Sequence, residues 1–329
     1  MTLIKINNAN VRNTTFENKR NIRTIDCKDY QWENNDMSKA FANCYNLYSV
    51  TNINDSVTNM SRTFQRCYNI KTTPEMPLSI NDMSETFEEC LLLSSINEIP
   101  NNVTNMYGTF SGCTNLINGI DLSDFDNLNN IDYLYLGCVN LTNASKLSNN
   151  IDRLAETFSG CTRLKNAPII PSSVTNMVNT FGYCHNLVNA PDLSNCTNLT
   201  DISGTFYSCR SLVNAPIIPN SVTNMSETFV GCFNINTIPN IPNSVTNMYM
   251  TYYACDNLQG NIFIESEKIT NAMDCFKNTS LTKNVYIPFT YENGVNTLTY
   301  NSFISSGYST TNRVNGVLLK DITIFLKNL

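Results

Sequence analysis

The chain has 329 residues and a formal net charge of −6, with 21 Lys and Arg residues against 27 Asp and Glu residues. Charged residues are sparse and no Lys/Arg cluster occurs, so nucleic-acid binding is disfavoured. The chain contains no apolar run long enough to span a bilayer, and we therefore expect no membrane insertion.

Residues 1–33 precede a strict internal repeat and contain Trp32, the single tryptophan of the chain. We expect this segment to be an N-terminal cap, because the open end of a repeat stack exposes core and strand edges. Its first residues lack the apolar core of a signal peptide. Either a secretion signal has been removed or the protein is made in the cytosol, and Met1 favours synthesis in the cytosol.

A repeat with a cysteine at a fixed position occupies residues 34–282. Successive cysteines are 23 residues apart, with two spacings of 25. The members of this cysteine ladder are Cys44, Cys67, Cys90, Cys113, Cys138, Cys161, Cys184, Cys209, Cys232 and Cys255. Such a period indicates a solenoid in which each repeat covers the apolar face of its neighbours. We expect about ten to eleven turns in one elongated body.

Apolar residues keep the same period as the cysteines. An aromatic residue precedes each cysteine by three positions, Leu or Ile follows it by three, and Met usually precedes it by seven. A degenerate further copy has Phe276 as its aromatic residue and Thr279 at the cysteine position. Cys275 is therefore out of register, and we do not count it in the ladder.

Each repeat divides at its cysteine into two halves. From Met to Cys the apolar residues fall at i, i+4 and i+7, which predicts a short helical or 3-10 segment. The residues after the cysteine are few and include Pro, as in Leu164–Pro171, which predicts brief, irregular strands. The fold class that follows is an α/β repeat solenoid with a poorly formed parallel sheet.

These motifs resemble a known family. The pattern Asn-Met-x-x-x-Phe-x-x-Cys-x-Asn-Leu, followed by a short strand and Pro, is similar to the BspA-like leucine-rich repeats. The likeness is strongest to the variety whose units begin Val-Thr-Asn-Met, as at residues 222–225. The resemblance implies a curved right-handed solenoid with strands on one face and short helices on the other. It also implies a binding or surface role without a shared catalytic residue.

The cysteines lack the close spacing of a metal site, since no two lie within five residues of each other. Disulfides between stacked neighbours are conceivable, but placement among apolar positions favours buried, reduced thiols. Cys27, Cys196 and Cys275, outside the ladder, are interpreted as incidental. Asn recurs two positions after and eight before the ladder cysteine, where its amide can bond turn backbone. We predict no metal and no cofactor.

Residues 283–329 leave the repeat pattern. We expect them to form a C-terminal cap or an attachment segment. Within them, Val285–Phe289 and Val317–Leu319 have the apolar character of strands, and Asn296–Ser305 is interpreted as a helix.

Catalysis has no candidate constellation. The single histidine, His185, follows a ladder cysteine at a position that unrelated residues hold in other copies, so no Ser/His/Asp arrangement can be argued around it. We predict that the protein is not an enzyme. Aromatic residues with a polar group are common at recognition surfaces. The ligand-binding candidates beside the ladder cysteines are Tyr183, His185, Tyr207, Arg210, Phe233 and Tyr253. Variable strand-side positions, among them Glu75, Glu98 and Asp192, are a second set.

Three functional hypotheses follow. The first is a phage virion component, in the tail or on the surface, that presents the repeat for adhesion to a host. A surface-type repeat without an export signal motivates it. Its partners would be other virion proteins or a host surface protein or glycan, and its location the virion after synthesis in host cytoplasm. The alternative is a bacterial or protist cell-surface adhesin, and the third hypothesis is an intracellular interaction scaffold.

Overall fold

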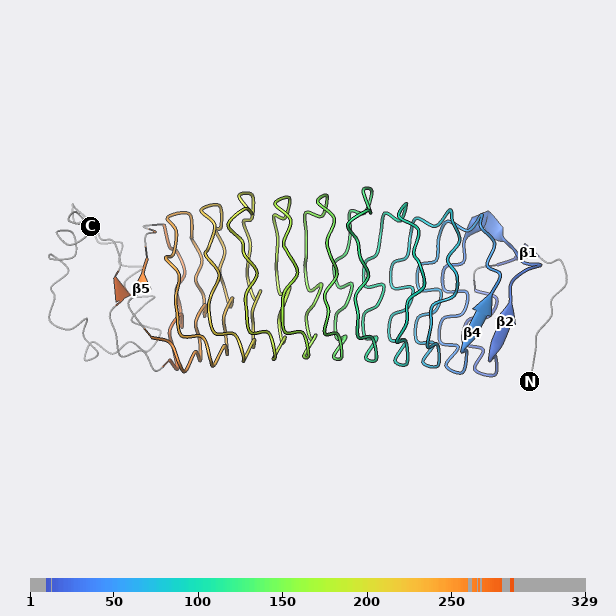
Figure 1. Ribbon diagram of the computed structural model, residues 1–329, viewed down its shortest axis with the longest axis horizontal. Coiled ribbons are helices and arrows are strands. Elements are labelled where there is room, and N and C mark those ends of the chain that lie inside the picture. Colours follow the sequence, from blue (N-terminus) through green and yellow to red (C-terminus); the bar gives the residue numbers. More distant parts are fainter. Residues whose placement is uncertain are drawn as a thin grey trace. The chain divides into compact units, whose positions relative to one another are not determined.

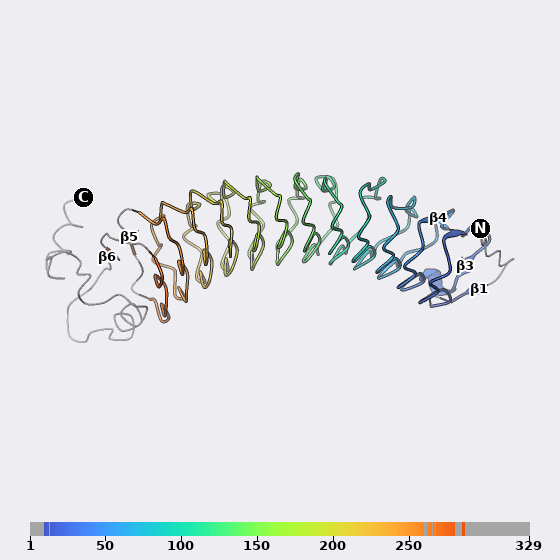
Figure 2. The ribbon, with the colours of Figure 1, turned by 90° about the horizontal axis from the view of Figure 1, so that it is seen from below.

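The computed structural model describes residues 10–12, 14–259, 262–264, 266, 268–279 and 285–286. The chain forms two compact units, Met1–Leu164 and Lys165–Leu329. In each unit the backbone winds through successive repeats that stack on one another (Figure 1), and Figure 2 shows this stacking from a perpendicular direction. We name each repeat by its ladder cysteine. Its turn half comprises the residues before the cysteine, and its strand half comprises the residues after it.

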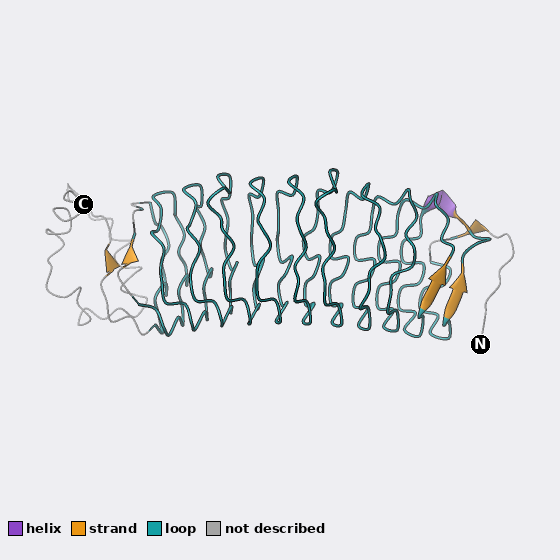
Figure 3. Ribbon diagram, in the orientation of Figure 1, coloured by secondary structure: helices purple, strands orange, loops and turns teal. Residues whose placement is uncertain are grey.

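Regular strands are short in the first unit. Strand β1 (Asn10–Val11) pairs in parallel with β3 (Gln31–Trp32), and β2 (Thr24–Asp26) pairs in parallel with β4 (Ser49–Thr51). The 3-10 turn η1 (Glu33–Asn35) follows β3. The repeats after β4 are drawn almost entirely as loops in Figure 3.

Strand halves beyond β4 pair mainly through isolated parallel bridges. In the second unit, Asn189 bridges to both Asn166 and Asn214. Pro168 stands two residues after Asn166 and has no N–H to extend the pairing. The predicted poorly formed parallel sheet is therefore confirmed.

The predicted short helices are wrong, because the segments from Met to Cys in the described repeats contain none, and η1 ends before Met37 (Figure 3). Each repeat has residues of positive φ five positions and one position before its cysteine, such as Lys39 at 59° and Asn43 at 60°. A right-handed helix does not accommodate such residues. Bonds from Ala40 N to Met37 O and from Cys44 N to Phe41 O close two consecutive β-turns instead, with the positive φ at the third residue as in type II.

Two such turns reproduce the i, i+4 and i+7 spacing of a helix, which is why the pattern suggested one. They leave alternate N–H groups pointing along the stack. Met37, Lys39, Phe41 and Asn43 donate to carbonyl oxygens of the Cys67 repeat at 2.8–2.9 Å. A repeat therefore satisfies only part of its backbone by itself and depends on its neighbour for the rest.

The aromatic residues form a stack inside each unit. From Phe16 to Phe158 in the first unit, successive ring centroids are 5.3–5.8 Å apart and ring planes agree within 19°. From Phe181 to Phe276 in the second, the distances are 5.2–5.9 Å. Since aromatic pairs contribute about 0.5–1.5 kcal/mol beyond the area they bury, this column is a main source of cohesion between repeats.

The thiols of the ladder cysteines have a specific kind of hydrogen-bond partner. The thiol of Cys67 donates to the carbonyl oxygen of Phe41 at 3.1 Å, an oxygen that already accepts the N–H of Cys44. The same bond recurs at 3.0–3.3 Å along both units. The thiol thus uses the second lone pair of a buried carbonyl group, while its sulfur costs little to bury.

Two polar columns complete the ladder. A buried threonine stands directly before most aromatic residues, and Thr63 Oγ1 donates to Met37 O at 2.9 Å. In the last copy Cys275 takes this position, so its exclusion from the cysteine ladder is confirmed. The structural role predicted for asparagine is also confirmed, because Asn59 Oδ1 accepts the N–H of Ser61 at 2.9 Å and Asn69 Nδ2 donates to Tyr45 O at 2.9 Å.

Residues before the predicted repeat region continue the stack. Phe16 packs on Phe41 at 5.3 Å, and its carbonyl oxygen accepts the Cys44 thiol. The buried Trp32 contacts Phe41 edge-on, with ring centroids 6.1 Å apart. The division into a cap at 1–33 and a repeat region at 34–282 stays a prediction.

In the second unit, β5 (Ile262–Phe263) pairs in parallel with β6 (Val285–Tyr286). Strand β6 covers the first part of the strand predicted at Val285–Phe289. The predicted strand Val317–Leu319 and helix Asn296–Ser305 lie outside the described residues. The role of residues 283–329 as a cap or attachment segment stays a prediction.

The β-turn geometry predicts a stabilising substitution. Ala254 has a φ of 54°, whereas the same position in the preceding repeat holds Gly231. Because an L-residue with a side chain pays about 1–2 kcal/mol for this conformation, we expect Ala254→Gly to raise the free energy of unfolding by about 1 kcal/mol. Thermal unfolding followed by near-UV circular dichroism measures the change.

The matched control is Ala215→Gly, in the strand half, where φ is not positive. Here glycine gains nothing and costs about 0.5–1 kcal/mol through backbone entropy. A loss of stability in both variants would contradict the turn assignment.

Candidate functional site

The predicted ligand-binding residues lie beside ladder cysteines of the second unit. His185, Arg210 and Phe233 hold the position directly after the cysteine in three consecutive repeats. Tyr183 directly precedes its cysteine, has a φ of 59° and is 50% exposed. Because the cysteines themselves are buried, their flanking residues form the rim of the stack rather than its core.

Five of the six predicted residues form two contacting groups, Tyr183 with His185 and Tyr207, and Arg210 with Phe233. The charge of Arg210 acts on His185 and so links the two groups. The rings of Tyr183 and Tyr207 lie 5.2 Å apart between centroids, tilted by 47°. The ring of His185 meets Tyr183 edge-on at 6.4 Å. Arg210 places its Cζ 5.8 Å from the centroid of Phe233. We call Tyr183, His185, Tyr207, Arg210 and Phe233 the shoulder cluster.

Charge in the shoulder cluster resides on Arg210. This side chain is exposed and has no ion pair with any residue that the structure describes. Burial, and then the positive charge of Arg210, lower the pKa of His185, so its imidazole is neutral at pH 7. The cluster therefore combines one available guanidinium group with aromatic rings.

Tyr253, the sixth predicted residue, has a different partner. Its hydroxyl oxygen accepts a hydrogen bond from Asn278 Nδ2 at 3.0 Å. Burial is the largest cause that raises the pKa of Tyr207, and the nearby Tyr253 is the smallest. We therefore place Tyr253 beside the shoulder cluster and outside it.

The first unit has a comparable arrangement directly after its cysteines, where Arg20 places its Cζ 4.8 Å from the ring centroid of Tyr45 and Tyr45 stacks on Tyr68 at 4.9 Å. Two other rim arginines of this unit are in ion pairs. Arg62 donates from Nε and Nη2 to the carboxylate of Glu85 at 2.6 and 2.9 Å, and Arg66 Nε donates to Glu89 at 3.1 Å. Each pair links equivalent positions of neighbouring repeats. Arg62 and Arg66 are neutralised within the stack, whereas Arg20, like Arg210, has no ion pair with any described residue.

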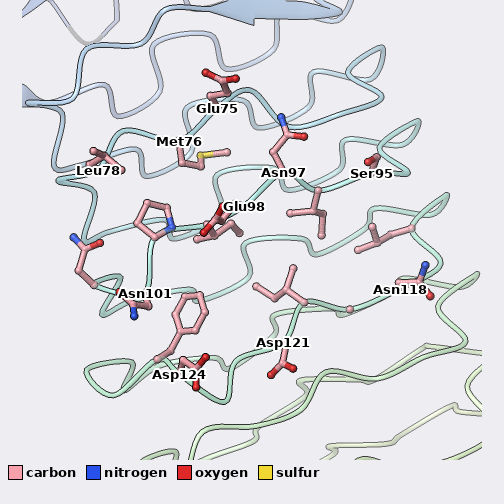
Figure 4. A pocket seen from close by; sticks show the side chains of 18 of the residues that line it. Glu75, Met76, Leu78, Ser95, Asn97, Glu98, Asn101, Asn118, Asp121 and Asp124 are labelled. Atoms are coloured by element: carbon pink, nitrogen blue, oxygen red, sulfur yellow. The ribbon is translucent and has the colours of Figure 1, made fainter.

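A groove with a volume of about 1290 Å³ lies on the strand side of the first unit. Figure 4 shows Glu75 and Glu98 at this groove together with Asp121 and Asp124. Glu75, Glu98 and Asp121 occupy the same position, eight residues after their cysteines, in three consecutive repeats. Met76 and Leu78 add apolar surface, so the groove combines acidic and apolar walls.

The sequence marked Glu75 and Glu98 as variable strand-side positions but did not predict a groove. A hollow depends on how far neighbouring repeats separate, and no residue pattern reports that distance. A smaller hollow of about 560 Å³ lies between the strand halves of the Cys44 and Cys67 repeats, with Tyr48, Lys71 and Thr73 among its lining residues.

All thirteen cysteines are buried and free, which confirms the prediction of buried thiols. Burial raises the pKa of Cys44 to about 11 and that of Cys138 to about 12. The pKa of the Cys196 thiol, outside the ladder, is raised by the same cause. Because the thiolate is the reactive form, these side chains are poor nucleophiles near neutral pH.

Within the described residues, no group of three or more His, Cys, Asp and Glu side chains is arranged to hold a metal ion. The same part of the chain contains no helix with the length and apolar character needed to cross a bilayer.

Comparisons with known proteins identify relatives of the whole repeat region. A family profile described as BspA type leucine rich repeat region matches in six copies, over residues 2–117, 83–211 and 179–309. A search of curated protein sequences found no match.

Among solved structures, a leucine-rich repeat protein from Bacteroides ovatus is 25% identical with a TM-score of 0.55, and the alignment covers 83% of this chain and 80% of that one. A leucine rich cell surface protein from Faecalibacterium prausnitzii is 18% identical with a TM-score of 0.41, covering 83% of this chain and 87% of that one. A leucine-rich repeat protein from Eubacterium ventriosum is 14% identical with a TM-score of 0.38, covering 86% and 82%.

The buried thiols predict alkaline unfolding. Their pKa values in the folded protein lie above the ordinary value of 9.0, so the unfolded state loses protons first as the pH rises. The thiols therefore contribute their full stabilisation below about pH 9. As the pH rises from there through their pKa values in the folded protein, the free energy of unfolding falls by about 1.4 kcal/mol per pH unit for each thiol affected. We expect Tm to be constant from pH 7 to 8 and to fall steeply between pH 9 and 11.

Cys138→Ala is the control for this assignment. We expect it to lower Tm at pH 7, because it deletes a buried group and a hydrogen bond, and to make the alkaline decrease shallower. A Tm that stays level up to pH 11 in reducing buffer would refute the assignment.

Proposed function

This chain belongs to the BspA-type leucine-rich repeat family, and we propose that it is a non-enzymatic binding protein whose shoulder cluster recognises an acidic carbohydrate. A binding or structural role is what the family indicates. The choice of ligand rests on the chemistry of the cluster.

The observation that carries this proposal is the unpaired guanidinium of Arg210 beside aromatic rings. Arg210 is the single arginine between Arg163 and Arg313, and it contacts Phe233 through a cation–π interaction. A guanidinium group binds carboxylate or sulfate oxygens in a bidentate manner. Tyr183 offers a half-exposed ring, and such rings combine an apolar face with a polar group. An acidic sugar presents both complementary features.

Two biological roles are compatible with such a binding protein. A cell-surface adhesin accounts for a BspA-type repeat at least as well as a phage virion component does. The adhesin would bind a host or neighbouring cell, and the virion component would bind a bacterial surface.

Two measurements separate them. Mass spectrometry of purified virions that found this chain in stoichiometric amount would support the virion and exclude the adhesin. Labelling of this chain by surface biotinylation of uninfected cells would support the adhesin and exclude the virion component.

Arg210→Gln tests the shoulder cluster. Since a hydrogen bond to a charged group contributes about 1.5–3 kcal/mol, we expect this change to weaken binding to arrayed sulfated or uronic-acid glycans by about tenfold or more. Neutral glycans should bind the native protein weakly. Biolayer interferometry on the best array hit gives the affinities.

Arg163→Gln is the matched control, because Arg163 is also exposed and has no ion pair within the described part of the chain. We expect it to bind as the native protein does. Equal affinity of Arg210→Gln and native protein would remove the cluster from recognition, and capture of acidic peptides in preference to glycans would replace the ligand class.

A further inference from the structure

The strand-side ladder of the first unit is interrupted at the groove, and also at the smaller hollow, where no bond runs from Lys71 N to Tyr48 O. Ser94 N donates to Lys71 O at 2.9 Å on one side, and Thr142 N donates to Ile117 O at 2.9 Å on the other. The equivalent bond between these two pairs of repeats, from Ile117 N to Ser94 O, is absent. All residues from 91 to 129 are described, and no backbone bond or bridge joins 92–103 to 115–128.

The interruption is bounded at both ends. Thr114 Oγ1 donates to Leu91 O at 3.2 Å where it begins, and Asn129 N donates to Thr104 O at 3.0 Å where the repeats join again. Between these bonds, residues 93–100 and 116–122 contain no turn, and no backbone hydrogen bond joins the two segments. Ile117 is 50% exposed.

Each wall is held by the repeat behind it. Asn97 donates from its backbone N to Thr73 Oγ1 at 2.8 Å and from Nδ2 to Thr73 O at 2.7 Å. On the opposite wall, Ile120 N donates to the hydroxyl of Tyr135 at 2.9 Å, and that hydroxyl also bonds Ser145 Oγ at 2.8 Å. Tyr135 is the one member of the first unit's aromatic stack, from Phe16 to Phe158, that carries a hydroxyl. These bonds fix both walls in position, so the groove is preformed.

The charged residues that line the groove are all acidic. Glu75, Glu98 and Asp124 have no ion pair within the described residues, while Asp121 is bound to Lys146 at 2.6 Å. Leu78, 70% exposed, supplies an apolar contact near the same rim. The charge favours a cationic occupant, and the open edges favour one with its own extended backbone.

We propose that the groove between the Cys90 and Cys113 repeats binds an extended, basic polypeptide segment by strand addition. The segment's main chain would pair with the open edges at Ser94 and Ile117, and its Lys or Arg side chains would reach Glu75, Glu98 and Asp124. Main-chain pairing supplies affinity in this mode of recognition, and the flanking side chains supply selectivity. This site is separate from the shoulder cluster, which lies in the other unit.

Fluorescence anisotropy with the full chain and labelled octapeptides tests the proposal. We expect a peptide of four Lys-Thr repeats to bind, and binding to weaken as salt rises. The same peptide with alternate backbone nitrogens methylated, and a peptide of four Glu-Thr repeats, should bind at least tenfold more weakly. Equal binding of the methylated peptide would overturn strand addition, and equal binding of the acidic peptide would overturn the charge selectivity.

Glu98→Gln tests the site itself. Because an exposed charge pair contributes about 0.2–1 kcal/mol, we expect a reduction in affinity of up to about fivefold, and a larger one when Glu75→Gln is added. The matched control is Asp192→Asn, at the same position of a repeat in the second unit, where bridges join the strand halves on both sides. If the Glu98→Gln and Asp192→Asn variants bound the Lys-Thr peptide with the same affinity, the peptide would not bind in this groove.

Hydrogen exchange gives a readout independent of the variants. We expect the Ile117 amide to exchange quickly in the free protein and slowly with the Lys-Thr peptide bound, while the Thr142 amide stays protected in both states. An Ile117 amide as protected as Thr142 in the free monomer would show that the groove is closed and refute the proposal. Protection of Ile117 that depends on protein concentration would assign the groove to a second copy of this chain instead.

Discussion

The structure depends on the exchange of backbone hydrogen bonds between neighbouring repeats. The two β-turns before each cysteine send alternate N–H groups to the next repeat, so a repeat cannot satisfy its buried backbone alone. Because every repeat makes the same bonds to its neighbour, equivalent positions in successive repeats have equivalent surroundings. The aromatic rings, the thiols and the threonines therefore recur as columns, because each residue packs on or bonds to its own equivalent or that equivalent's neighbour.

The sequence predicted the stack because periodicity reports which positions are buried. It misjudged the turn half because the i, i+4, i+7 spacing fits a helix and two successive β-turns equally well. The deciding signal is the residue at the positive-φ positions, which is Gly at Gly108 and Gly112 but Lys39 or Glu85 elsewhere. Since larger residues also occupy these positions, glycine does not mark them consistently, and the helix could not be rejected from the pattern.

The candidate sites were predictable to different degrees. Tyr183, His185, Tyr207, Arg210 and Phe233 were identified because they flank a buried column, and a flanking position in a tight turn must be at the surface. That Arg210 lacks an ion pair while Arg62 has one with Glu85 was not predictable, since pairing depends on what the next repeat offers. The groove was missed because it follows from bonds that are absent between two repeats, and absent bonds leave no period in the sequence.

The two proposed sites lie where a unit leaves a charged side chain or a backbone edge without a hydrogen-bond or ion-pair partner inside the stack. The first unit pairs Arg62 with Glu85 and Arg66 with Glu89, keeps Arg20 over the ring of Tyr45, and leaves a strand-side edge open between Ser94 and Ile117. The second unit continues its strand-side bridges from Asn166 to Thr237 and leaves Arg210 available at the rim. A donor or acceptor that already has a hydrogen-bond or ion-pair partner in the stack is less available to a ligand. A repeat that copies its core faithfully therefore acquires binding sites only where a column changes residue or a bond between neighbours is missing.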